Sequence, residues 1–399
     1  MTNSPSDNRR WYVLALGSAI NGVAFAMSTA CMPVLFEEIS KQLHLDIVQI
    51  GIVWGFGSVA AIFSIPAAGF LADRFGAKRV LALGCVLAAV FGALRGLSGS
   101  YATLTITSLL FGMAAEALPV VVVKNVTQWF YGKGLGAAQG IITAMVAAGM
   151  LFGAMVSATV LSPWLGGWQH VTYFYGAITL ILGIVWIFTA PEPPAAPAAN
   201  PPPFLKSARH VLSKSNIWLI GIAIMLFAGS NKGVLGYLPL YLTNSGWSTA
   251  GADSGVSVLN AAGMAAAVPF ALLSDKIGNR KKIVIPGLIL AMVGMVLLSE
   301  FTGPVAWGLI IVAGLSRDVI WAMSSTLVVE TPDIGPAYAG MAVGIVQSLS
   351  RLGYVFAPPV GNSLVAFRPG APFLFWAALA LLSVIVFLFI RERKVSISL

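Results

Sequence analysis

A small set of charged residues falls inside the long apolar stretches of this chain, where a lipid bilayer would surround them. The candidates are Glu116, Lys124, Lys232, Arg317, Asp318 and Arg351. Because a charge at membrane depth costs at least about 2.5–3.5 kcal/mol, each of them needs a reason in binding, coupling or structural pairing. Basic residues outnumber acidic ones in the set, and Arg and Lys hold carboxylates and inorganic oxyanions well. The set therefore favours binding of a small anion.

The basic residues near the middle of their stretches are the first candidates for contact with that anion. Neutral hydrogen-bonding side chains lie near them in the sequence, and Asn21 lies at a comparable depth in the first stretch. We predict the following substrate-binding residues: Asn21, Asn231, Lys232, Arg317, Gln347, Arg351 and Tyr354. A structural alternative stays open for Arg351, which can join two helices instead of contacting substrate.

Glu116 and Asp318 are the candidates for proton coupling. A carboxyl group removed from water can change its protonation state when its exposure changes. Pro119 follows Glu116 and predicts a kink beside that acid. A permanent ion pair is the alternative for each, and for Asp318 the partner would be Lys232. Lys124, nearer the end of its stretch, either contacts substrate or extends to the cytoplasmic surface.

The seventh apolar stretch has an unusual centre. Between Gly229 and Pro239, glycines flank the pair Asn231-Lys232. This composition is typical of bent or locally broken membrane helices, which expose backbone groups to a ligand. We therefore predict a bend or break near Lys232, with close helix packing through glycine as the alternative.

The composition is that of a membrane protein. The chain is 58% hydrophobic and 9% charged, against roughly 25% charged residues in soluble domains. The net charge of +9 does not indicate nucleic-acid binding, because no basic tract with interleaved aromatic residues occurs. The 2 cysteines and 3 histidines have no partner spacing, so we predict no disulfide, metal site, cofactor or catalytic group.

Twelve stretches are long enough to cross a bilayer, which takes about 20 apolar residues. They lie at approximately 11–36, 47–72, 79–98, 101–130, 135–160, 167–190, 216–243, 250–274, 283–301, 304–330, 337–361 and 371–390. A Pro-rich polar stretch cannot form a helix and is interpreted as a flexible linker. We predict an all-α membrane protein with twelve transmembrane helices in two pseudo-symmetric six-helix bundles, 1–190 and 216–399, joined by a cytoplasmic linker, 191–215.

Most Lys and Arg residues between the stretches fall on the side of the N-terminus. An excess of basic residues marks the cytoplasmic side, so both termini are predicted in the cytoplasm. The first stretch is too long for a signal peptide and is interpreted as a retained helix. We predict a monomeric multi-pass protein of the bacterial inner membrane, in contact with the lipid bilayer.

One short sequence occurs twice, about half a chain length apart. Residues 69–79 read GFLADRFGAKR and residues 271–281 read ALLSDKIGNRK. Each copy lies between two apolar stretches, and such internal repeats are typical of transporters built from two halves. Asp73 and Gly76 of the first copy match Asp275 and Gly278 of the second. The first copy also contains Gly69, Arg74 and Arg79, and the second contains Arg280.

The repeated sequence resembles motif A of the major facilitator superfamily, which lies between spans 2 and 3 and again, degraded, between spans 8 and 9. The resemblance covers the whole chain. It implies two six-helix bundles that rock about a central site, lined mainly by spans 1, 4, 7 and 10. It also implies that the motif residues form a gating loop that latches one conformation, with the aspartate accepting hydrogen bonds at a helix N-terminus. A plain positive-inside hairpin is the alternative.

The chain departs from two subfamilies. The fifth stretch lacks the Gly-Pro pair of drug–proton antiporters, and it lacks the Asn-containing, Gly-rich segment of nitrate transporters. Thr107 and Ser108 stand where many members of the superfamily have an arginine. Multidrug efflux and nitrate transport are therefore disfavoured.

Together these observations predict a secondary active transporter, not an enzyme, for a small organic or inorganic anion, with a carboxylate favoured. Proton symport and anion exchange both stay open, so the further partner is either protons or a counter-anion. The alternatives are a proton-coupled exporter of amphipathic or drug-like compounds and a non-transporting membrane sensor. An excess of acidic residues in the spans would favour the exporter, and the opposite occurs.

Overall fold

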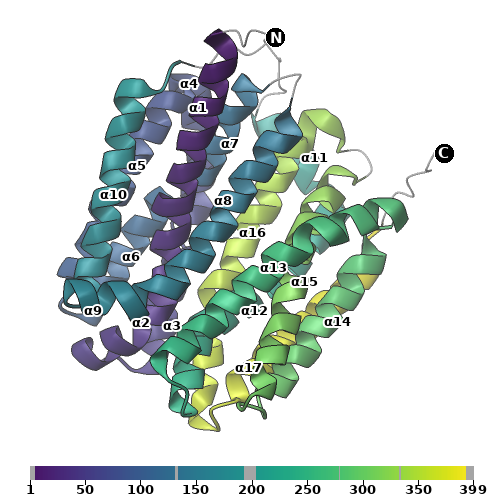
Figure 1. The fold of residues 1–399 in the computed structure, drawn as a ribbon. Coiled ribbons are helices and arrows are strands. Elements are labelled where there is room, and N and C mark those ends of the chain that lie inside the picture. The colour runs from purple at the N-terminus through teal and green to yellow at the C-terminus, as the bar shows by residue number, and fades with distance from the viewer. Residues whose placement is uncertain (1–4, 131–133, 193–203, 278, 332–333, 392–399) are drawn as a thin grey trace. The chain divides into compact units, whose positions relative to one another are not determined.

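The computed structural model describes residues 5–130, 134–192, 204–277, 279–331 and 334–391. These residues form helices and connecting turns, and none of them forms a β-strand (Figure 1). A chain in lipid must satisfy its backbone N–H and C=O groups internally, and a helix does so within one segment. The all-α prediction is confirmed.

The contacts divide the chain into two units, each with its own buried apolar core. Unit 1 contains Met1–Asp46 and Phe56–Ala199, and unit 2 contains Ile47–Gly55 and Asn200–Leu399. The segment Ile47–Gly55 thus belongs to unit 2, although its neighbours in the sequence belong to unit 1. No sequence pattern predicts that Ile47–Gly55 belongs to unit 2.

The membrane-spanning stretches of unit 1 are repeatedly interrupted. A π-helical segment divides the first, a turn at residues 57–60 divides the second, and a turn at residues 116–117 divides the fourth. Helices α5 and α10 pack side by side (Figure 1). The elements are α1 (Pro5–Ile20), η1 (Asn21–Met27, π-helical), α2 (Ser28–Leu43), α4 (Ala61–Phe75), α5 (Ala77–Leu94), η2 (Arg95–Leu97), α6 (Tyr101–Ala115), α7 (Leu118–Trp129), α8 (Leu135–Val156), η3 (Ser157–Leu161, π-helical), α9 (Ser162–Leu165) and α10 (Trp168–Thr189).

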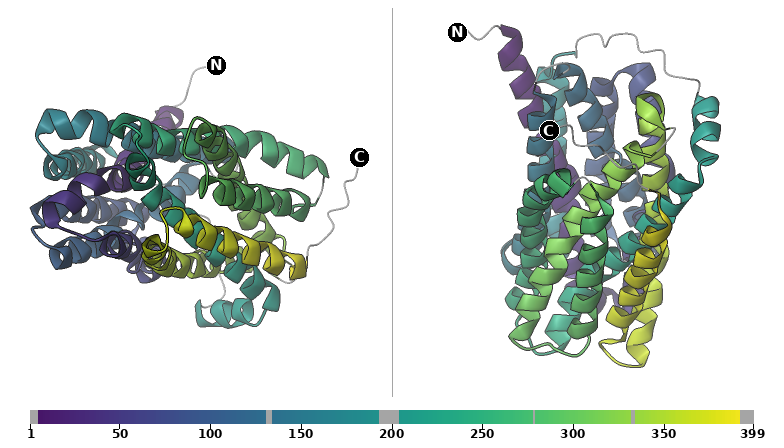
Figure 2. Two further views of the ribbon diagram at one scale, coloured as in Figure 1. Left: turned by 90° about the horizontal axis from the view of Figure 1, so that it is seen from below. Right: turned by 90° about the vertical axis from the view of Figure 1, so that its right-hand side faces the viewer.

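Unit 2 includes continuous helices of 25 to 30 residues. Helix α12 packs against both α16 and α17, and Figure 2 shows this arrangement from two further sides. The elements are α3 (Ile47–Phe56), α11 (Phe204–Leu212), α12 (Ser215–Asn244), α13 (Thr249–Ile277), α14 (Lys281–Leu298), α15 (Val305–Val329), α16 (Gly335–Ser363), η4 (Leu364–Ala366) and α17 (Ala371–Phe389).

Within the described residues, 9 helical stretches are long and apolar enough to cross a membrane. Helices α13, α15 and α16, of 29, 25 and 29 residues, lie at the remaining predicted spans. Since a helix of about 20 residues already covers about 30 Å, each is long enough to span a bilayer. The chain is therefore a multi-pass membrane protein.

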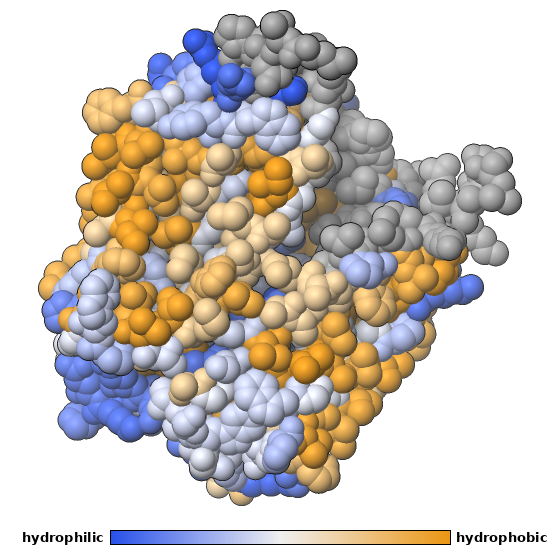
Figure 3. Space-filling view, in the orientation of Figure 1, coloured by the Kyte–Doolittle hydropathy of each residue, from blue (hydrophilic) through white to orange (hydrophobic). Residues whose placement is uncertain are grey.

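Large apolar side chains cover the outer faces of the helices. Phe63, Phe188 and Leu388 expose 74%, 82% and 58% of their surface. In Figure 3 a broad apolar region covers α5 and α10, and hydrophilic residues gather beyond the ends of these helices. Exposed apolar patches of this extent are unfavourable in water and suit contact with lipid acyl chains.

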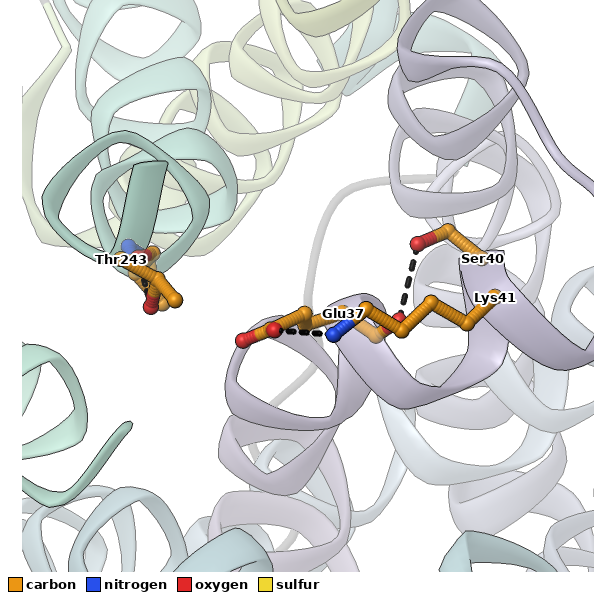
Figure 4. Close-up of polar contacts among 5 residues, drawn as sticks. Glu37, Ser40, Lys41 and Thr243 are labelled. Atoms are coloured by element: carbon orange, nitrogen blue, oxygen red, sulfur yellow. Dashed lines mark hydrogen bonds and ion pairs between the residues drawn. The ribbon is translucent and has the colours of Figure 1, made fainter. Parts of the chain in front are cut away.

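Side chains near the ends of two helices make local polar contacts. Near the end of α2, Lys41 Nζ lies 2.6 Å from a carboxylate oxygen of Glu37, and Ser40 Oγ donates to the Glu37 carbonyl at 2.9 Å (Figure 4). Near the end of α12, Thr243 Oγ1 donates to the Pro239 carbonyl at 3.0 Å. These contacts link side chains to groups one turn earlier in the same helix.

The stretch between the predicted bundles differs from its prediction. Helix α11 occupies Phe204–Leu212, so the prediction that 191–215 forms no helix is wrong for this part. The prolines end before α11 begins, which removes the obstacle to helix formation. Val211 is fully buried in the core of unit 2, and the His210 ring stacks on Tyr338 at 4.2 Å between centres. The Pro-rich residues 193–203 lie outside the described residues.

Candidate functional site

The buried lysine of unit 2 lies against two aromatic rings. Lys232, on α12, is 7% exposed, and its Nζ lies 3.3 Å from the centre of the Trp54 ring and 5.2 Å from that of Tyr354. The Trp54 indole N–H, from α3, donates to the Lys232 carbonyl at 2.9 Å. Aromatic faces stabilise a desolvated ammonium by about 2 kcal/mol without cancelling its formal charge. The rings therefore help to hold a cation at this depth.

Helix α16 adds an arginine to this group. The Arg351 guanidinium carbon lies 5.0 Å from the Tyr354 ring centre, with the two residues one turn apart on α16. Gln347, one turn before Arg351, is half-buried. We define Trp54, Lys232, Arg351 and Tyr354 as the cation–aromatic cluster. It brings together predicted binding residues from α12 and α16 and adds Trp54 from α3.

Helix α12 carries Lys232 without the predicted break. Helical geometry continues from Ser215 to Asn244, with Pro239 inside the helix. The glycines instead admit large neighbours: a Cβ at Gly236 would lie 2.5 Å from the Trp54 ring, and one at Gly233 would overlap the Trp376 ring. Close packing through glycine, the alternative, explains these residues. Asn231, next to Lys232, is half-buried.

The second predicted arginine is bound by a neighbouring helix. Arg317 Nη1, on α15, donates to Asn260 Oδ1 at 2.6 Å, and Asn260, on α13, is 4% exposed. This bond orients the guanidinium and gives Arg317 a structural role besides its predicted one. The Asp318 side chain lies outside the described residues, so its pairing with Lys232 and its proton role stay predictions.

In unit 1, Glu116 lies in the interruption of the fourth span. Helix α6 ends at Ala115 and α7 begins at Leu118, with Pro119 in its first turn, so the backbone departs from a straight helix where Pro119 predicts it. Ser58 Oγ donates to Glu116 Oε1 at 2.9 Å, and both side chains are buried.

Two backbone segments approach each other closely beside Glu116. Ser58 belongs to the turn at residues 57–60 that divides the second span. A Cβ at Gly112, one turn before Glu116, would overlap the carbonyl oxygen of Gly57. Two helix interruptions therefore meet at the buried carboxyl group, and glycine is required for them to do so.

Asn21 begins the π-helical segment of the first span. It is fully buried, and within the described residues neither its amide nitrogen nor its amide oxygen has a hydrogen-bond partner. π-Helical turns are rare and often occur at functional sites. Asn21 was predicted as a neutral hydrogen-bonding group, and its amide has no structural partner there that explains it.

The first copy of the repeated loop joins α4 to α5. Gly76 separates the two helices and has φ +88°, a conformation that side chains other than glycine rarely adopt. Lys124 Nζ, from α7, donates to the Gly69 carbonyl at 3.0 Å. Lys124 thus ties the fourth span to the loop, a role that neither of its two predicted alternatives included.

The charged residues of the two loops are only partly described. Arg74 and Arg79 are exposed, whereas Arg280 Nη2 lies 3.1 Å from Glu330 Oε1 just beyond α15. The motif positions outside the description are the Asp73 and Asp275 side chains and all of Gly278. The latch therefore stays a prediction.

Two buried charges were missed in the sequence. Arg95 is 2% exposed: both terminal nitrogens donate to the Ser28 carbonyl at 3.2 Å, and the guanidinium lies 3.7 Å from the Phe111 ring centre. Its position inside the predicted stretch 79–98 was an available signal. Asp253, near the start of α13, is 2% exposed and was overlooked. Adding both residues leaves the excess of basic groups unchanged.

Nothing in the sequence marked Trp54 or Ser58 as a candidate site residue, because tryptophan and serine are common in membrane helices. Among the residues that the structure describes, no group of three or more His, Cys, Asp or Glu side chains could hold a metal ion.

A family model, the Major Facilitator Superfamily, matches residues 14–339. The chain therefore belongs to the Major Facilitator Superfamily, which places it among membrane transporters and not among enzymes.

The chain is similar to two named transporters. GudP of Bacillus subtilis (strain 168), a probable galactarate/D-glucarate transporter, is 28% identical over 202 residues, which are 48% of this chain and 43% of GudP. NarK1 of Thermus thermophilus, a probable nitrate/nitrite antiporter, is 26% identical over 219 residues, which are 52% of this chain and 48% of NarK1. The matched part of the chain spans about half the length of these relatives.

Among solved structures, the crystal structure of the nucleoside transporter NupG superposes with a TM-score of 0.76 at 15% identity, covering 96% of this chain and 100% of NupG. At this identity the likeness concerns the fold alone. It confirms the predicted superfamily fold.

Proposed function

We propose that this chain is a secondary active transporter that moves a small anion, with a carboxylate as the favoured class, by alternating access. The superfamily membership supports transport, and the relatives named for galactarate/D-glucarate and for nitrate/nitrite support an anionic substrate. The subfamily features that are missing from the fifth span favour the carboxylate over nitrate.

The observation that carries the proposal is the cation–aromatic cluster of unit 2. Lys232 and Arg351 lie within a few residues of mid-span on two packed helices and share contact with the Tyr354 ring. Ring contact stabilises both cations, and a carboxylate that binds beside them adds an electrostatic attraction and charge-assisted hydrogen bonds. In this proposal Arg351 binds the carboxylate with two parallel hydrogen bonds, and Lys232 adds a point charge.

Neutral groups complete the binding role. Gln347 and Asn231 are half-buried beside the cluster and supply hydrogen bonds to substrate oxygens. Arg317 contributes less, because Asn260 already accepts one of its hydrogen bonds at 2.6 Å. Asn21 serves the substrate from the first span.

Glu116 is the proposed coupling group, together with Asp318. The Ser58 hydroxyl that donates to Glu116 Oε1 can also rotate and accept a hydrogen bond from the O–H of a protonated carboxyl, so this pair can form a hydrogen bond in both protonation states. Proton symport requires a change in the protonation state of Glu116, and anion exchange does not. The two repeated loops act as the gate, with both termini in the cytoplasm and the chain a monomer in a bacterial inner membrane.

The test is thermal unfolding of the purified chain with a panel of ligands: galactarate, acetate, nitrate and the lipophilic cation tetraphenylphosphonium. A ligand that binds the folded state raises Tm as ln(1 + [L]/Kd). We expect stabilisation by a carboxylate that disappears in Arg351→Ala, while Arg368→Ala, an exposed arginine paired with Glu300, leaves it intact.

Stabilisation by the lipophilic cation alone would refute the anion proposal and favour an exporter. Stabilisation by nitrate alone would retain an anion but remove the carboxylate.

A further inference from the structure

Helix α11 of unit 2 has one buried side and one basic, exposed side. Ser207 and Val211, one turn apart, are 5% and 0% exposed, and the helix packs beside α16 (Figure 1). Lys206, Arg209 and Leu212 lie on the opposite side of the helix, and all three are exposed. The buried side fixes α11 on unit 2, so the two cations keep their place on its outer surface.

An apolar stripe of α12 leads directly to the exposed side of α11. Ile222 and Trp218, one turn apart on α12, are 37% and 42% exposed, and Leu212 at the end of α11 is 41% exposed. The Trp218 indole N–H donates to the Leu212 carbonyl at 2.9 Å, which joins the stripe to α11. Because α12 is long and apolar enough to cross a membrane, its exposed apolar side chains face lipid. The stripe therefore brings the lipid phase to Leu212.

Trp218 marks the level of the lipid headgroups. Tryptophan is enriched at membrane–water interfaces, because its ring is apolar and its N–H is polar. Trp218 lies in the first turn of α12, which begins at Ser215, so this end of the span is at the membrane surface.

The two cations of α11 are within reach of these headgroups. Arg209 and Lys206 lie three and six residues before Leu212. Six helical residues span about 9 Å, and the headgroup region of one leaflet is about 5–8 Å thick. Because Lys and Arg side chains are long and flexible, both cations reach the headgroups in whichever direction α11 leaves the membrane surface.

The charge at this end of unit 2 suits an anionic partner. Within the described residues, neither cation of α11 has an ion-pair partner. The exposed Arg391 lies beside the start of α12, where Asn216 Nδ2 donates to its carbonyl at 3.1 Å. Glu330, an acidic residue at this end, already lies 3.1 Å from Arg280. The described residues here therefore leave an excess of positive charge.

We propose that Lys206, Arg209 and Leu212 form a membrane-surface anchor. The two cations bind the phosphate groups of anionic lipids, and Leu212 inserts among the upper parts of the acyl chains. Amphipathic helices with basic residues bind anionic membranes in this way. The inference needs only that the chain spans a membrane, and it is independent of the transported substrate. The anchor holds the start of α12 at the lipid surface.

The first experiment locates Leu212 relative to the membrane. The full chain carries Leu212→Cys, labelled with a nitrobenzoxadiazole fluorophore, in vesicles of phosphatidylcholine and phosphatidylglycerol. Cys31 and Cys85 are 0% exposed, so the label reacts at the introduced cysteine. Ile222→Cys, on the apolar stripe of α12, is the lipid-facing reference. The quenchers are a lipid spin-labelled near its headgroup and aqueous iodide.

We expect the spin-labelled lipid to quench the fluorophore of Leu212→Cys more strongly than iodide does, as it does for Ile222→Cys. Stronger quenching of Leu212→Cys by iodide, with Ile222→Cys still quenched by lipid, overturns the anchor. Helix α11 would then lie in water, and its basic side would face a soluble partner.

The second experiment measures lipid selectivity by thermal unfolding of the full chain in a neutral detergent. Phosphatidylglycerol, phosphatidylcholine or inorganic phosphate is added, and a ligand of the folded state raises Tm as ln(1 + [L]/Kd). We expect phosphatidylglycerol to stabilise the chain more than phosphatidylcholine does. Arg209→Gln weakens the apparent affinity for phosphatidylglycerol about fivefold, equivalent to about 1 kcal/mol, and adding Lys206→Gln weakens it about fivefold again.

Arg368→Gln is the matched control, because Arg368 is an exposed arginine beyond the other end of α16, and it leaves this affinity unchanged. Wild-type affinity for phosphatidylglycerol in the double variant overturns the anchor. An equal loss in Arg368→Gln also overturns it, since net charge alone would then explain the effect. Stabilisation by inorganic phosphate as large as that by phosphatidylglycerol assigns the cations to a soluble anion and overturns the membrane role.

Discussion

The two units differ in how regular their spans are. Unit 2 includes continuous helices of 25 to 30 residues and places the buried Lys232 and the half-buried Arg351 against aromatic rings. Unit 1 interrupts its spans with two π-helical segments and two turns, and within the described residues its Asn21 and Asn125 amides have no hydrogen-bond partner. Both units bury fixed charge, since Arg95 of unit 1 lies on the Phe111 ring, so the contrast concerns the regularity of the backbone around the polar groups.

Regular and interrupted helices suit different polar groups. A charge in a low-dielectric interior must be held in one place, because a small displacement from its stabilising groups costs several kcal/mol. A continuous helix supplies that rigidity. Helix interruptions free backbone groups and permit local rearrangement, which suits the neutral contacts and the protonation change proposed for Glu116.

The largest effect is expected from Lys232→Met. Methionine retains the packing against Trp54 but removes the charge, so carboxylate affinity falls about hundredfold, equivalent to about 2.7 kcal/mol. Lys41→Met, at an exposed position, is the matched control. The measurement is Kd by titration calorimetry. A Lys232→Met variant that binds carboxylates like the wild type would remove unit 2 from charge recognition.

Gly112→Ala tests the contact between the interruptions in unit 1. The added methyl group would overlap the Gly57 carbonyl, and overpacking against backbone destabilises by about 2 kcal/mol. We expect Tm to fall by several degrees. Gly140→Ala, where no atom lies within 4 Å of the added carbon, is the control and leaves Tm unchanged or higher. Equal Tm values for the two variants would show that the interruptions do not meet closely.

Glu116→Gln separates coupling from binding. Glutamine still accepts from Ser58 but cannot change its charge, so uptake driven by a proton gradient falls about tenfold while anion exchange continues. Flux in proteoliposomes with and without a pH gradient measures both. Uptake by the variant that still follows the pH gradient would assign coupling elsewhere, to Asp318 in the first instance.

The smallest effect is expected at Arg317, whose guanidinium is already held by Asn260. Arg317→Gln lowers carboxylate affinity about threefold, and adding Asn260→Leu lowers it no further, because residues in one hydrogen bond are not additive. The measurement is the carboxylate Kd of Arg317→Gln, of Asn260→Leu and of the double variant, which together form a double-mutant cycle. A loss as large as that of Lys232→Met would place Arg317 in the binding site itself.

The sequence predicted those features that depend on local composition. Apolar length located the spans, and Pro119 located the interruption beside Glu116 because proline removes a backbone donor wherever it occurs. The glycine at position 76 marked a turn that needs positive φ. The buried cations stood out because charge is rare in such stretches.

Features that depend on tertiary packing escaped prediction. Trp54 contacts Lys232 only because Ile47–Gly55 packs with unit 2, an arrangement without a local signal. The glycines of α12 have the composition of a hinge, yet they accommodate Trp54 and Trp376, and composition alone cannot distinguish these two uses. Likewise, the lack of hydrogen-bond partners for Asn21 and Asn125 among the described residues depends on tertiary packing, which has no local signal.

The most direct test of the account is counterflow in proteoliposomes that contain the full chain. Vesicles are loaded with unlabelled galactarate and diluted into trace radiolabelled galactarate, with no ion gradient. The account predicts transient accumulation of label in the wild type and its loss in Lys232→Met, with accumulation retained in Lys41→Met. Absence of accumulation with every carboxylate tested, combined with accumulation of tetraphenylphosphonium, would contradict the claim that this protein moves a small anion.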